Sequence, residues 1–188
     1  PYFVLFYIAI PSVDVSLCLT LPISILTAGF MVRAFIIFHD CGHGSFFKSQ
    51  RTNDLLGIIT GIIAFTPYYR WKHQHAIHHA TSGDLDRRGV GDVYTMTVQE
   101  YLAAPKWKKF GYRVMRNPFA MLIIGPMLMF VIVERIPPKE GQREIASVWW
   151  TNLALAVIVT VMGLTFGWQN YLSAQLLVLF FGTIAGVW

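Results

Sequence analysis

Residues 15–43 read VSLCLTLPISILTAGFMVRAFIIFHDCGH, an apolar run of helix length that ends in two histidines. Residues 15–38 contain a single charged side chain, Arg33, and the run is close to the roughly 20 residues that cross a bilayer as a helix. His39 and His43 follow at a spacing of four, which places both imidazoles on one face if the helix continues. The stretch therefore predicts a membrane helix that presents two nitrogen ligands at the membrane edge.

Uncharged apolar runs recur at residues 148–166 and 171–188. The whole chain is 55% hydrophobic and 13% charged, with a mean hydropathy of +0.51, whereas a soluble domain is about 25% charged. This number of charges is too small to cover the surface of a soluble protein. The predicted fold is therefore an all-α integral membrane protein. Residues 2–13 indicate the remnant of a first span that turns through residues 11–14. We therefore expect four spans in one domain, residues 1–188, incomplete at both ends.

The distribution of charge predicts which segments share a face of the membrane. Residues 70–116 hold nine Lys/Arg and four Asp/Glu, and short basic segments stay on the cytoplasmic side. Residues 55–66 are too short to cross, which favours an interfacial or re-entrant segment. Residues 119–133 are interrupted by Gly125-Pro126, and a crossing there would export Arg135 and its basic neighbours. We therefore expect no crossing there, and a cytoplasmic helical cap that carries the histidines.

All six histidines lie between residues 39 and 79, and three of them form a second helical set. His75, His78 and His79 fall within about 100° on a helical wheel, whereas His73 points about 160° away from His75. Neutral imidazoles suit iron, zinc, copper and nickel, and a single tetrahedral zinc takes four ligands. Five convergent histidines exceed that need. The spacing therefore predicts two metal ions, with iron favoured, and it excludes His73 from the ligands.

Four nearby residues are candidates to support these ligands from behind. Metal-bound histidines commonly donate their second N–H to a carboxylate, which points to Asp40, Asp84 and Asp92. Asp84 lies beside Arg87, so a solvated ion pair is the alternative for it. Trp71 precedes His75 by four residues and could pack beneath it, although an interfacial aromatic side chain is the more common use.

Two stretches of the sequence resemble the histidine boxes of membrane fatty acid desaturases. Residues 39–47, HDCGHGSFF, are similar to the first box, and residues 71–79, WKHQHAIHH, are similar to the second. The spacing of the first box resembles the acyl-lipid omega-6 (delta-12) branch, and residues 91–94, GDVY, are similar to bacterial members. The resemblance implies four spans, cytoplasmic boxes and a di-iron centre with eight or more histidines. It implies that His39, His43, His75, His78 and His79 are iron ligands.

The resemblance also implies the reaction, in which O₂ and two electrons remove two hydrogens from a lipid acyl chain. The family's third histidine box is absent from these residues, so we expect this chain alone to be inactive. Beyond the metal ligands the sequence indicates no catalytic residue. The nearest alternative is a hydroxylase or ketolase on the same scaffold. An alternative of another class is a metal transporter, but that protein would place its histidines along the spans.

The motifs that the sequence lacks, together with its charge, indicate which partners the protein needs. No GxGxxG loop and no P-loop occurs, so electrons must come from another protein. The resemblance suggests a donor of the ferredoxin or cytochrome b5 type, and a basic cytoplasmic face would attract an acidic donor or anionic lipid headgroups. Residues 106–116 fit a basic helix on a membrane surface or a solvated loop helix equally well. We expect a multi-pass protein of a bacterial inner membrane that acts on lipid and binds no nucleic acid.

Overall fold

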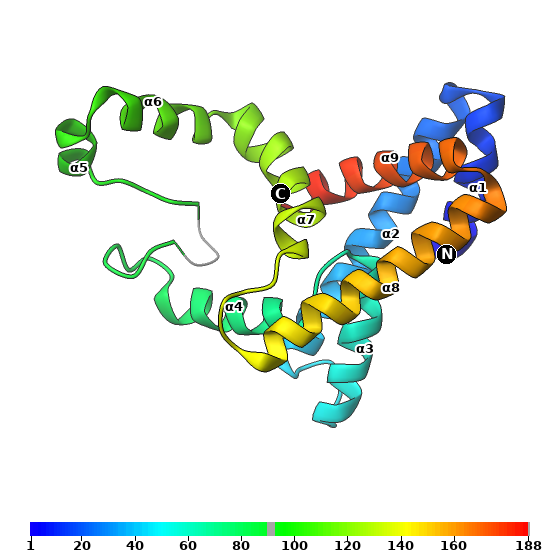
Figure 1. Cartoon of the computed structure of the whole chain (residues 1–188), viewed down its shortest axis with the longest axis horizontal. Helices are drawn as coiled ribbons and strands as arrows, with labels where there is room; N and C mark the ends of the chain where they lie inside the picture. The colour runs from blue at the N-terminus through cyan, green and yellow to red at the C-terminus, as the bar shows by residue number, and fades with distance from the viewer. Residues whose placement is uncertain (90–92, 188) are drawn as a thin grey trace.

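The computed structural model describes residues 1–89 and 93–187, and every regular element in those residues is helical (Figure 1). The all-α prediction is therefore confirmed for the described residues. In chain order the elements are α1 (Tyr2–Val15), α2 (Leu17–His43), α3 (Gln50–Ile63), α4 (Tyr68–Thr81), α5 (Val98–Ala103), α6 (Lys106–Met115), the π-helical turn η1 (Ala120–Ile124), α7 (Gly125–Val131), the 3₁₀ turn η2 (Val133–Arg135), α8 (Gln142–Phe166) and α9 (Trp168–Val187).

Two of the described helices, α2 and α8, are long and apolar enough to cross a membrane. By length and composition, α6 and residues 120–135 would count as a further candidate if they formed one broken span, and these two parts are bent by 62°. The predicted span at 171–188 falls in α9, although Trp188 lies outside the described residues. The four-span arrangement and the single domain stay predictions.

The buried core of the long helices lies where α1, α2 and α9 meet. Its members are Phe6, Ala9, Ile10, Ala28, Met31, Tyr171, Ala174, Val178 and Leu179. Helix α9 approaches α2 closely because Gly182 has no side chain: a Cβ there would lie 2.1 Å from the Met31 methyl carbon. The outer face of α8 is also apolar, since Trp150 is 71% and Leu164 74% exposed. Long helices that are apolar on both faces are expected where lipid covers the outside.

The predicted turn at residues 11–14 is wrong in position. Helix α1 continues through Pro11 to Val15, and the chain reverses at Ser16, whose backbone is extended (φ −171°, ψ 138°). The Ser16 side chain accepts the N–H of Cys18 and so caps the start of α2. A proline inside a helix lacks the N–H donor and crowds the carbonyl four residues earlier, and membrane helices tolerate this where neighbouring groups compensate. Pro11 therefore does not end the helix.

The α1–α2 turn and the α8–α9 turn lie at the same end of the molecule. The amide of Asn170, just inside α9, donates a hydrogen bond to the carboxylate of Asp14. His39 and His43 lie at the C-terminal end of α2, which is the end away from the α1–α2 turn (Figure 1). The two turns and the histidines therefore face opposite ends of the long helices, as the predicted topology requires.

The segment between α6 and α8 returns to the end of the molecule where α4 lies. Pro126 cannot donate a backbone hydrogen bond, and the chain passes there from a π-helical turn into the short α7. Beyond α7, the Arg70 guanidinium donates to the carbonyls of Val133 (2.9 Å) and Ile136 (2.7 Å). Arg135 in turn donates to the carbonyl of Phe65. These contacts place Arg135 beside the start of α4, which favours a segment that does not cross.

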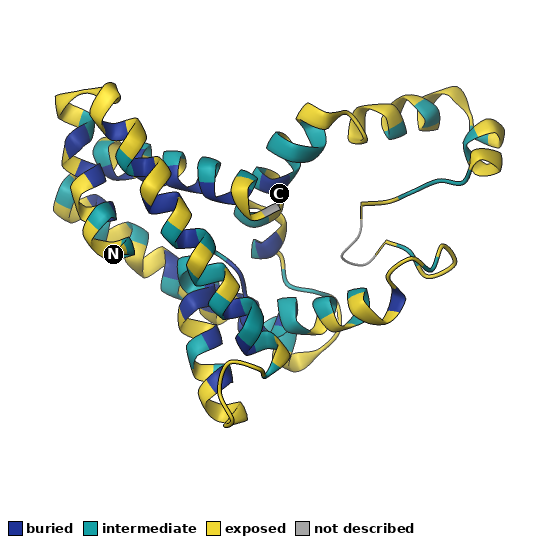
Figure 2. Cartoon of the chain, turned by 180° about the vertical axis from the view of Figure 1, so that it is seen from behind, coloured by how far each residue is buried: buried dark blue, intermediate teal, exposed yellow. Residues whose placement is uncertain are grey.

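Helices α5 and α6 stand away from the bundle, and most of their residues are exposed (Figure 2). Lys109 donates to the Leu102 carbonyl and Arg113 to the Tyr101 hydroxyl, so two basic side chains of α6 face α5. Trp107 is 76% exposed on the same helix. Both interpretations of residues 106–116, a membrane-surface helix and a solvated one, remain compatible with this placement.

We expect residues 119–133 not to cross the membrane, and cysteine labelling with a membrane-impermeant reagent tests this. The background lacks Cys18 and Cys41, and single cysteines replace Glu140 or Asn170. Glu140 is a better site than Gly141, because Gly141 has φ 90°, a conformation that favours glycine. Outside labelling at Asn170 alone is the expected result. Outside labelling at Glu140 alone would show that the segment crosses.

Candidate metal centre

Four histidines from two helices converge on one point. His39 and His43 lie at the end of α2, and His75 and His79 lie on α4. The Nε2 atom of His75 is 3.1 Å from that of His39, 3.1 Å from that of His43 and 3.0 Å from that of His79. One ring nitrogen from each of the four lies within 4.8 Å of all the others. The Nε2 atom of His75 therefore lies within about 3 Å of the other three nitrogens.

Hydrogen bonding alone cannot account for this arrangement. An imidazole nitrogen carries either one hydrogen or one lone pair, so the Nε2 atom of His75 can form one good hydrogen bond. It nevertheless faces three other Nε2 atoms at hydrogen-bonding distance. A cation among the four rings would accept their lone pairs, and metal–nitrogen bonds of about 2.0–2.1 Å suit the separations of 3.0–3.1 Å between His75 and each of the other three. The residues present therefore fit a metal ion.

The electrostatics of the group also favour a metal. Burial, followed by the neighbouring imidazoles of His39, His79, His43 and His78, lowers the pKa of His75 to about 4. His75 is therefore neutral near pH 7, and a neutral imidazole is the form that binds metal. Asp40 accepts from Nδ1 of His39 at 3.2 Å, which directs the Nε2 lone pair of His39 toward the other histidines.

Local structure explains how the two pairs of histidines meet. Helix α2 ends at His43 because Gly44 adopts the left-handed conformation (φ 71°), a common helix stop. Trp71 of α4 packs against the backbone of Gly42, where a Cβ would lie 2.7 Å from the indole ring. The Trp71 ring stacks on His75 with centroids 4.2 Å apart and planes 19° apart. Of the two uses considered for Trp71, the structure shows the packing beneath His75, and its role in supporting a metal ligand stays a prediction.

The fifth predicted ligand, His78, is outside the group of four. Its ring centroid lies 5.9 Å from that of His75 and 5.7 Å from that of His79. His78 is therefore next to the centre without sharing its focus, and its role as a ligand stays a prediction. His73 points elsewhere, with Nδ1 4.0 Å from Glu144 of α8. Its exclusion from the ligands agrees with this placement.

The supporting carboxylates differ in their placement. Asp40 contacts His39, as the proposed role requires. Asp84 instead accepts from the Arg87 side chain at 2.7 Å and from the backbone N–H of Asp86, which matches the alternative of an ion pair in a loop. Asp92 and Gly91 of the GDVY stretch lie outside the described residues.

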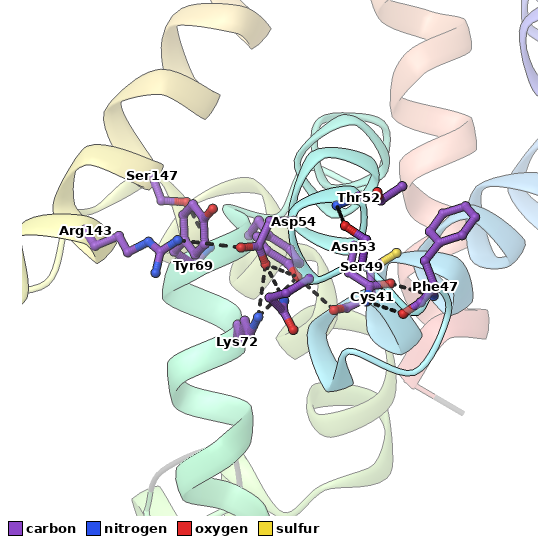
Figure 3. A network of polar contacts seen from close by, with 12 residues as sticks. Cys41, Phe47, Ser49, Thr52, Asn53, Asp54, Tyr69, Lys72, Arg143 and Ser147 are labelled. Carbon is purple, nitrogen blue, oxygen red and sulfur yellow. Dashed lines mark hydrogen bonds and ion pairs between the residues drawn. The ribbon is translucent and has the colours of Figure 1, made fainter.

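A polar network that was not predicted from the sequence surrounds the start of α4 (Figure 3). Its centre is Asp54 of α3, which lies 3.1 Å from Lys72, 3.0 Å from the Tyr68 hydroxyl and 3.6 Å from Arg143 of α8. Burial alone would raise the pKa of Asp54, but hydrogen bonds from Gln50, Lys72 and Tyr68 hold it below its usual range. The carboxylate is therefore charged at neutral pH and joins three helices.

A second part of the network attaches α8 to α4. Pro67 precedes α4 and offers no side-chain cap, and Ser147 of α8 accepts the N–H of Tyr69 at 3.1 Å instead. The guanidinium of Arg143 lies 3.8 Å from the Tyr69 ring centroid. Part of this network could have been predicted from the sequence: Tyr68 precedes His75 by seven residues, a spacing that puts both side chains on one helix face. The contacts from α8 had no signal in the sequence.

The family model described as fatty acid desaturase matches residues 16–188. A fatty acid desaturase of Bacillus subtilis (strain 168) is 46% identical over 189 residues, covering 100% of this chain and 54% of that protein. An sn-1 acyl-lipid omega-3 desaturase (ferredoxin) of Nostoc sp. (strain 36) is 33% identical over 127 residues, covering 67% of this chain and 33% of that protein.

A further relative, an sn-1 oleoyl-lipid 12-desaturase of Synechocystis sp., is 34% identical over 100 residues, covering 53% of this chain and 28% of that protein. The chain thus spans about half the length or less of the curated relatives it matches. No solved structure matches it.

Proposed function

The chain belongs to the fatty acid desaturase family, and from this membership we propose that the protein desaturates lipid acyl chains with O₂ at a histidine-held, non-haem di-iron centre. The observation that carries the proposal is the meeting of four Nε2 atoms around His75. An all-nitrogen donor set of neutral imidazoles suits iron.

We assign His39, His43, His75 and His79 to one iron, because their nitrogens already share a focus. His78 lies beside this group and is assigned to the second iron. The sequence contains six histidines, fewer than the eight or more that the family resemblance implies. We therefore place the remaining ligands of the second iron outside these 188 residues, in agreement with the greater length of the Bacillus subtilis relative.

The proposed reaction balances as a four-electron reduction of O₂. A saturated –CH₂–CH₂– unit supplies two hydrogens with two electrons, and an external donor supplies two electrons with two protons, giving a C=C bond and two waters. Iron, when bound, supplies the oxygen activation that no side chain can provide for an unactivated C–H bond. The chain's own residues hold the ligands: Asp40 orients His39, and Trp71 supports the ring of His75.

Substrate and donor are proposed from the chemistry of the chain and from its relatives. The apolar outer faces of α2 and α8 support a location among lipid acyl chains. The relative from Nostoc is named as acyl-lipid and ferredoxin-dependent, and we propose a membrane lipid substrate and an external donor of the ferredoxin or cytochrome b5 type here. We place the histidine end of α2 on the cytoplasmic face of a bacterial inner membrane, where a soluble donor can reach it.

Lipid analysis of cells that express the full-length gene product tests the proposal. We expect new double bonds in membrane acyl chains, and two irons per purified protein. Hydroxylated or keto acyl chains in place of double bonds would favour a related oxygenase. One zinc per chain with no iron would contradict the di-iron proposal altogether. A metal transporter is disfavoured because the histidines gather where the end of α2 meets α4 and do not lie along the apolar helices α2 and α8.

A further inference from the structure

We propose that Tyr68 is a positioning residue that sets the register of the two histidine helices, and that Asp54 holds it in place. This inference rests on the proposed metal centre and concerns side chains that do not contact it. On α4, Tyr68, Lys72, His75 and His79 lie within about 60° of one another around the helix axis. This one face is turned toward the end of α2.

Tyr68 contacts the histidine segment of α2 through its hydroxyl group. The phenol oxygen is 2.8 Å from the carbonyl oxygen of Cys41, which lies between His39 and His43. That carbonyl belongs to the last turn of α2, where backbone acceptors have no partner further along the helix. Gly44 donates to it at 3.0 Å, and the Tyr68 hydroxyl is its second donor. The bond therefore joins the two histidine helices at one backbone atom.

Packing leaves the Tyr68 ring almost no freedom. The side chain is 1% exposed, and its ring packs edge-on against Phe38 with centroids 5.7 Å apart. On the other side it lies against the backbone of Gly57, where a Cβ would come within 2.2 Å of the ring. Because the ring is packed this tightly, the position of its hydroxyl group fixes the position of α4.

Asp54 and Lys72 fix the hydroxyl group itself. Asp54 lies 3.0 Å from the phenol oxygen, and Lys72 bridges the two at 3.1 Å and 3.5 Å. Burial, followed by the Asp54 carboxylate, raises the pKa of Tyr68, so the phenol keeps its proton and remains a donor. The hydroxyl carries one hydrogen, which the Cys41 carbonyl (2.8 Å) and the Asp54 carboxylate (3.0 Å) share as a three-centre hydrogen bond. The phenol oxygen is thereby held between the end of α2 and Asp54, and the register of α4 on α2 follows from it.

The test compares Tyr68→Phe with the matched control Tyr69→Phe in the full-length gene product. Tyr68→Phe removes one oxygen and keeps the ring. We expect about 10-fold weaker iron binding, because a direct partner of a metal ligand is worth about 10–100-fold and Tyr68 acts one step further out, through the Cys41 backbone. We also expect a changed absorption or Mössbauer spectrum and little change in Tm. Tyr69→Phe keeps the ring that lies against Arg143 and should match the unsubstituted protein in all three measurements.

Further outcomes separate this inference from the proposed function. Asp54→Asn, which keeps the shape and removes the charge, should shift iron affinity and spectrum in the same direction by a smaller amount, and it serves if Tyr68→Phe does not fold. Unsubstituted protein with two irons, together with Tyr68→Phe of equal affinity and equal spectrum, would overturn the positioning role alone. Unsubstituted protein without iron would overturn the proposed function, and this inference with it.

Discussion

Replacing His75 with alanine is expected to abolish iron binding at the centre and to lower desaturation by at least about 100-fold. Losing an outer partner of a ligand already costs about 10–100-fold in metal affinity or activity, and His75 is proposed as a ligand itself. It has the largest expected effect because its Nε2 atom lies within 3.0–3.1 Å of the three other nitrogens. Iron per chain and unsaturated acyl chains in the expressing cells are the measurements.

His73→Ala is the matched control for this experiment. His73 lies on the same helix two residues away, but its ring faces Glu144 at 4.0 Å and is outside the group of four. Its loss should leave iron content near normal. Equal losses from both substitutions would show that the order of α4, not ligation by His75, determines iron binding.

Replacing Arg70 with leucine is expected to destabilise the protein by about 3–5 kcal/mol, the cost of breaking a buried ion pair from one side. The Arg70 Nε atom lies 3.8 Å from the Glu134 carboxylate, and Glu134 is 1% exposed. Leucine would remove both the nearby charge and the donors to the carbonyls of Val133 and Ile136. In thermal unfolding in detergent the effect corresponds to a fall in Tm on the order of 10 °C.

Two further variants identify the cause of that loss. The double variant Arg70→Leu/Glu134→Leu removes both charges and should recover much of the Tm, because an apolar pair of similar volume often replaces a buried ion pair well. Arg87→Leu is the control, since Arg87 pairs with Asp84 in an exposed loop and should leave Tm unchanged. An Arg70→Leu protein as stable as Arg87→Leu would contradict the structural role of the buried pair.

Much of this molecule could be predicted from local patterns in its sequence. The apolar run before His39 is long enough for a span, and α2 forms there and ends where Gly44 stops it. The spacing of four between His39 and His43 put both rings on one face, because neighbours on a helix are determined by its 3.6-residue period. Local periodicity also separated His73 from His75, and the structure keeps them apart.

Only the tertiary structure decided which histidines meet. On an isolated α4 the rings of His75, His78 and His79 are equal candidates, because one helical arc holds all three. The crossing of α4 on α2 brings His75 and His79 to the shared focus and leaves His78 beside it. That crossing depends on close packing of Trp71 on Gly42 and on the bond from Tyr68 to the Cys41 carbonyl. These contacts join residues far apart in the chain, and helical periodicity carries no information about them.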